Sequence, residues 1–145
     1  TSFVPDAALA PLLAKLFLLI RIISDYPEPA EAPTIHRLPQ AELAAHACAR
    51  PCILRAYYSR GGAIYIDETL DLAGDKYARS VLVHELVHYL QDLNGTHADQ
   101  EACIRGPLLE REAYWVQDQY LRKVRGPMLS GLHYTNRFWR PCEDP

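Results

Sequence analysis

This chain has no long run of one kind of residue. Basic residues are not clustered, and the 145 residues carry a formal net charge of -3, which argues against nucleic acid as a partner. The most apolar stretch, residues 9–23, contains Lys15 and Arg21, whereas a membrane-spanning helix requires about 20 uncharged residues. No internal repeat or low-complexity tract occurs. We therefore predict a protein that has no transmembrane segment and does not bind nucleic acid.

The length and composition are typical of one globular domain. Hydrophobic residues make up 49% and charged residues 23% of the chain, as in ordinary soluble folds, and 145 residues are enough for one core but not for two. We predict a single domain over residues 1–145, with an N-terminal helix in residues 1–26, a proline-rich connector in residues 27–33 and a C-terminal tail in residues 126–145.

Hydrophobic periodicity and turn signals predict an α+β fold. We expect a short, mainly antiparallel sheet packed on two long helices. Arg60, Gly61 and Gly62 join two strand candidates and are typical of a hairpin turn. Gly106 and Pro107 are suited to the start of a new helix. The predicted strands cover residues 34–38, 53–59 and 63–69, and the predicted helices after the first cover residues 40–48, 76–93 and 108–124.

Two histidines four residues apart, His84 and His88, are the strongest functional signal in the chain. On a helix, residues i and i+4 lie one turn apart on the same face, so both imidazoles can reach one cation. Glu85 would lie beside a metal-bound water, where a carboxylate can act as a general base. The apolar residues of this helix form an arc that leaves out both histidines. The alternative is a metal-free domain in which His84 and His88 face solvent.

A second helix carries the run Leu108-Leu109-Glu110-Arg111-Glu112-Ala113-Tyr114, and 21 residues separate His88 from Glu110. A His-Glu-x-x-His helix followed at this distance by Glu-x-x-Ala resembles the gluzincin class of zinc metallopeptidases. The resemblance implies a small zincin-like domain that hydrolyses peptide bonds. It implies one Zn²⁺ per chain, held by His84, His88 and Glu110, with Glu85 as the base. Ala113 matches the small residue that lets the two helices approach closely.

Hydrophobic periodicity alone does not identify the third metal ligand. Glu110 and Glu112 flank the apolar stripe of their helix on opposite sides, so periodicity does not choose between them, and only the resemblance favours Glu110. The chain departs from the family at Tyr114, where many gluzincins carry an aspartate that orients a ligand histidine. Gln117 or Asp92 are the candidates to replace it.

The resemblance also implies where a substrate binds. In gluzincins a peptide pairs antiparallel with the edge strand just before the catalytic helix, and residues 63–67 occupy that place here. This implies that Ile64, Tyr65 and Ile66 contact the substrate, although their alternation also fits any half-buried strand. Many family members add a Tyr or His donor to the transition state, and the candidates here are Tyr134, His133 and His97.

Four cysteines allow three disulfide connectivities. Cys48 and Cys52 are close enough to pair locally, and Cys103 with Cys142 would tie the tail over the catalytic helices. We prefer this pairing and expect an exported protein, periplasmic or extracellular, whose leader has been removed before Thr1. We expect a monomer that acts on a peptide or protein substrate. The rival function is a binding module that keeps the metal without proteolysis, or one inhibited by its own tail.

Overall fold

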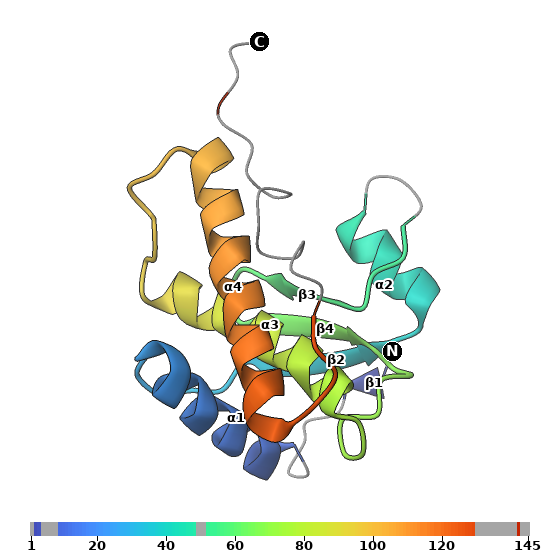
Figure 1. Cartoon of the computed structure of the whole chain (residues 1–145). Helices are drawn as coiled ribbons and strands as arrows, with labels where there is room; N and C mark the ends of the chain where they lie inside the picture. Colours follow the sequence, from blue (N-terminus) through green and yellow to red (C-terminus); the bar gives the residue numbers. More distant parts are fainter. Residues whose placement is uncertain (1, 4–8, 49–51, 130–141, 143–145) are drawn as a thin grey trace.

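The computed structural model describes residues 2–3, 9–48, 52–129 and 142. Four helices accompany a four-stranded sheet in this part of the chain (Figure 1). The small α+β fold predicted from the sequence is confirmed. The elements in chain order are β1 (Ser2–Phe3), α1 (Ala10–Ser24), β2 (Thr34–Leu38), α2 (Gln40–Ala47), β3 (Ala56–Ser59), β4 (Ala63–Asp67), α3 (Lys76–Leu93) and α4 (Ala102–Val124).

The sheet has the strand order β1-β2-β4-β3. β1 pairs antiparallel with β2, β4 pairs antiparallel with β3, and the central pair β2 and β4 is parallel. Gly61 and Gly62 both have positive φ angles in the β3–β4 turn, a conformation that glycine adopts without a steric penalty. The predicted hairpin is therefore confirmed.

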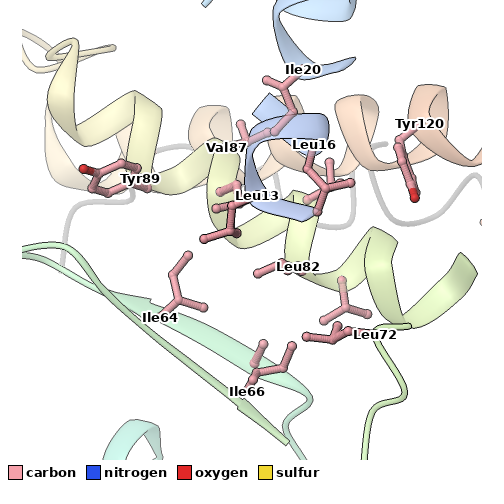
Figure 2. Packing of buried hydrophobic residues seen from close by; sticks show 14 of the residues in the cluster. Leu13, Leu16, Ile20, Ile64, Ile66, Leu72, Leu82, Val87, Tyr89 and Tyr120 are labelled. Atoms are coloured by element: carbon pink, nitrogen blue, oxygen red, sulfur yellow. The ribbon is translucent and has the colours of Figure 1, made fainter. Parts of the chain in front are cut away.

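Helix α3 is central to the domain: it packs against α4 and α1 and also against β3 and β4 (Figure 1). The carboxylate of Asp75 accepts a hydrogen bond from the backbone N–H of Tyr77 and caps the first turn. Figure 2 shows side chains from α1, α3 and the sheet converging in one core, among them Leu16, Leu82 and Ile64. With neighbours on several sides, α3 is held firmly, and so are the histidines that it carries.

Helix α4 begins earlier than predicted. It starts at Ala102, so Gly106 and Pro107 lie inside the helix, and the prediction that they begin a new helix is wrong. Proline lacks an N–H and therefore removes the hydrogen bond to the carbonyl four residues back, that of Cys103. The helix loses this one bond but continues on both sides of it.

Strand β4 is not at the edge of the sheet, and the prediction that residues 63–67 form an edge is wrong. β2 pairs with one side of β4 and β3 pairs with the other. Ile64 and Ile66 are fully buried in the core, while Tyr65 points to the opposite face and stacks on His46 and Tyr57. The edge strand on this side is β3, which contacts α3.

Both predicted disulfides are present. Cys48 pairs with Cys52, and Cys103 pairs with Cys142. The second bond holds residue 142 next to the first turn of α4. Within the described ranges, none of the helices combines the length and apolar character needed to cross a membrane.

Candidate metal centre

Three side chains from α3 and α4 converge on one point. The Nε2 atoms of His84 and His88 are 3.2 Å apart. The carboxylate of Glu110 places one oxygen 2.5 Å from Nε2 of His88 and the other 3.5 Å from Nε2 of His84. A metal ion bound tetrahedrally by nitrogen at about 2.0–2.1 Å requires ligand atoms about 3.3 Å apart. The two imidazoles are already near that spacing.

Gln117 sets the orientation of the first histidine. Its amide N–H₂ donates to the hydroxyl of Ser80, 3.1 Å away. That hydroxyl in turn donates its proton to the backbone carbonyl of Tyr77, so it can only accept from Gln117. The amide oxygen of Gln117 therefore points to Nδ1 of His84, 3.1 Å away. An oxygen at this place accepts a proton from Nδ1, which leaves the lone pair of Nε2 available to a metal.

Gln91 sets the orientation of the second histidine, His88. Its amide N–H₂ donates to the carbonyl of Leu109 at 3.0 Å and to the carboxylate of Glu112 at 2.9 Å. Because both partners are acceptors, the amide oxygen must be the atom 2.8 Å from Nδ1 of His88. The Nε2 lone pair of His88 is again left for a cation.

The structure brings Glu110, and not Glu112, to the two histidines. Glu112 accepts hydrogen bonds from Gln91 and from the hydroxyl of Tyr26, 2.6 Å away. Tyr26 follows the end of α1 and also contacts the hydroxyl of Thr96 at 3.0 Å. Glu112 is thus linked to His88 only through Gln91, and it anchors that glutamine.

The charges around this point favour a cation. Burial by itself would lower the pKa of His88, but the hydrogen bond that it donates to Glu110 and the negative charge of Glu85 raise it to about 9. Burial would raise the pKa of Glu110, yet hydrogen bonds and charges from the two histidines hold it well below its usual value. A proton on His88 and a metal ion compete for the same lone pair. Two imidazole nitrogens and one carboxylate are a donor set that zinc accepts.

Glu85 is buried beside this group, with 7% of its surface exposed. Burial raises the pKa of its carboxyl group, and His84 and His88 oppose this rise. The backbone of Tyr58 on β3 hydrogen-bonds to the same carboxylate. A buried carboxylate with a raised pKa is better suited to accept a proton near neutral pH than an exposed one.

Two pockets open on either side of the three converging side chains. A pocket of about 230 Å³ is lined by His84 and Glu85. A second, of about 400 Å³, is lined by His88 and Glu110. The 230 Å³ pocket is bordered by the residues leading into the edge strand, including Ile53, Leu54, Arg55 and Ala56. Extended chain could therefore pass along β3 and the converging side chains.

Other residues predicted for the site lie elsewhere. Ile64 and Ile66 are core side chains, and Tyr65 lies on the face of the sheet that carries α2. His97 lines a separate hollow with Trp115 and Glu112. Tyr134 and His133 lie outside the described residues.

Two further residues contact the histidines, and this role was predicted for neither of them. Tyr114 packs edge-on against the ring of His84, with ring centroids 4.3 Å apart. Gln91 lies one turn after His88 on the same face of α3, a spacing that could have identified it. Of the two candidates to replace the missing aspartate, Gln117 contacts His84. Asp92 instead accepts from Tyr58.

Comparisons with protein-family models, with curated proteins and with solved structures find no match to this chain. Its own geometry and chemistry therefore carry the functional argument.

Proposed function

We propose that this protein is a zinc-dependent peptidase of the gluzincin type. The observation that carries the proposal is the convergence of His84, His88 and Glu110, whose ligand atoms all lie within 4.8 Å of one another. The tautomers imposed by Gln91 and Gln117 support it, because both direct an Nε2 lone pair to the same point. Two histidines and one carboxylate leave a fourth position open, as catalytic zinc sites require.

Zinc at this point would polarise the substrate carbonyl and lower the pKa of water. Glu85 takes the proton from the attacking water and delivers it to the leaving amine. Its burial excludes bulk water from this exchange. His84 and His88 keep their orientation through the two glutamines, so no rearrangement is needed during the reaction.

The peptide aligns along the outer edge of β3. This strand is paired only with β4 in the described part of the sheet, and an extended peptide can add to an unpaired edge as a further strand. Residues Ile53 to Ala56 border the pocket that contains His84 and Glu85. We therefore place the substrate contacts on β3 and not on β4, where the sequence predicted them.

The protein acts outside the reducing cytosol in this proposal. Two disulfides persist in oxidising compartments such as the periplasm or the extracellular space. We expect the chain to function as a monomer, since the three ligands lie in one chain and no second copy is needed to complete the group.

The proposal is tested by metal analysis followed by a cleavage assay. Protein purified without a histidine tag should contain close to one zinc per chain. It should also cleave components of a random peptide mixture, with the cut sites read by mass spectrometry. Zinc without cleavage would favour the rival, a metal-binding module that is inert or self-inhibited. Protein that contains no zinc and takes up none on dialysis would refute the proposal.

A further inference from the structure

The pocket of about 400 Å³ beside His88 and Glu110 has an unusual lining. Two arginines border it, Arg60 from the β3–β4 turn and Arg105 from the second turn of α4. Of the described residues, Asp92 is the one carboxylate that lines it besides Glu110. We call this hollow the arginine pocket.

Arg105 is half-buried, and its side chain has no partner in the described part of the chain. Among the described residues, the guanidinium of Arg105 makes no hydrogen bond and no ion pair. A guanidinium carries five N–H donors, and leaving them unmatched away from water is costly. An arginine in this condition next to a catalytic centre is a candidate for binding an anion.

Asp92 does not neutralise the pocket. Its carboxylate already accepts a short hydrogen bond, 2.6 Å, from the hydroxyl of Tyr58. Its ion pair with Arg60 spans 4.0 Å, and the side chain of Arg60 is 77% exposed. Since an exposed pair at this distance is weak, the guanidinium of Arg60 can turn to a ligand. Two cations thus face two carboxylates that already have partners, Asp92 with Tyr58 and Glu110 with the two histidines.

The pocket on the other side of the centre differs in character. Beside His84 and Glu85 its lining is mainly apolar or aromatic, and Arg55 is the basic residue among its described residues. The positive charge of Arg55 acts on the carboxylate of Asp67, whose pKa it helps to lower. A substrate that crosses the centre therefore meets apolar surface on one side and cationic surface on the other.

We propose that the arginine pocket binds a carboxylate of the substrate, held by Arg105 with help from Arg60. The inference rests on the proposed function: it assigns the protein to peptides with a carboxylate near the cleaved bond. Arginine pairs with a carboxylate through two parallel hydrogen bonds, which orients the substrate as well as attracting it. The carboxylate is either an Asp or Glu side chain or the C-terminus of the peptide.

Binding and cleavage are measured with N-acetylated hexapeptide mixtures. One arm compares Glu with Gln at the third or fourth position of C-amidated peptides, and detects a side-chain carboxylate. The other arm compares free with amidated C-termini in mixtures that lack Asp and Glu. Affinities are taken from the zinc-loaded Glu85→Gln variant, and kcat/KM from the unmodified enzyme. Arg105→Gln is the test variant. Arg111→Gln is the matched control, an exposed arginine of the same helix that lines a different hollow.

We expect one of the two carboxylates to tighten binding by about 10-fold or more, as a charge-assisted pair does. Arg105→Gln should abolish this preference, and Arg111→Gln should keep it. Equal binding with and without the carboxylate overturns the proposal, and so does a preference that survives in Arg105→Gln. If the preference is present and lost as expected while the unmodified protein cleaves nothing, the arginine pocket stands and the peptidase proposal fails.

Discussion

Gln91 and His88 lie one turn apart on α3, and the amide oxygen of the glutamine is 2.8 Å from Nδ1 of the histidine. The same glutamine is held by Glu112 and by the carbonyl of Leu109. A ligand histidine is usually oriented by a carboxylate, a carbonyl or a water. Here a neutral amide does this for each histidine, so the centre gains no further negative charge from these partners.

Replacing Gln91 by leucine should weaken zinc binding by about 10- to 100-fold, because His88 loses the acceptor that selects its tautomer. Competition with a chelator measures this affinity. Gln100→Leu is the control, an exposed glutamine in the loop before α4, and should leave affinity unchanged. Unaltered affinity in Gln91→Leu would show that the amide does not orient the histidine.

Glu110→Ala should be purified largely without zinc, because it removes one of three ligands. Glu112→Ala should retain zinc and lose no more than about 100-fold in affinity, since this residue acts only through Gln91. Zinc content and chelator competition report both effects. The reverse ranking would move the ligand to Glu112 and contradict the geometry of α4.

Glu85→Gln should keep zinc and the fold while lowering kcat by about 10²- to 10⁴-fold, because the amide cannot accept the proton. His84→Ala should instead lose the metal. Peptide cleavage and zinc content together separate the two roles. Cleavage at the parental rate by Glu85→Gln would remove the glutamate from the mechanism.

Asp67, the last residue of β4, makes the stability of the protein depend on pH in the acid range. Burial would raise the pKa of its carboxyl group, but hydrogen bonds from Thr69 and Gln40 lower it below the usual value. A lowered pKa contributes stability that is complete above the unfolded-state pKa of about 3.9 and is lost as pH falls through the folded-state pKa.

Asp67→Asn should therefore destabilise the protein at pH 7 by about 1–3 kcal/mol, and the difference from the unmodified protein should shrink below about pH 4. Asparagine retains an acceptor for Thr69, but its N–H₂ opposes the donor of Gln40. Urea unfolding of both proteins at matched pH measures the difference in the free energy of unfolding. If both proteins lose metal at low pH, that loss lowers both free energies and cancels in the difference. A difference that stays constant down to pH 3 would contradict this account.

Local pattern determined much of this protein. Helical spacing predicted the bounds of α3, and the local sequence pattern predicted β2 from Thr34 to Leu38. The spacing of His84 and His88 was enough to place two imidazoles on one face. These features depend on contacts between near neighbours in the chain, so the sequence expresses them directly.

Only the tertiary structure decided which residues meet across elements. Periodicity places Glu110 and Glu112 on either side of one stripe, but the packing of α4 on α3 brings Glu110 to the histidines and turns Glu112 to Tyr26. Strand order likewise depends on pairing between distant segments. Because β2 pairs in parallel with β4, the edge strand is β3, whereas the sequence had predicted β4. The direction of a side chain around its own helix or strand is local, whereas the partner on the other side is set by how the whole core packs.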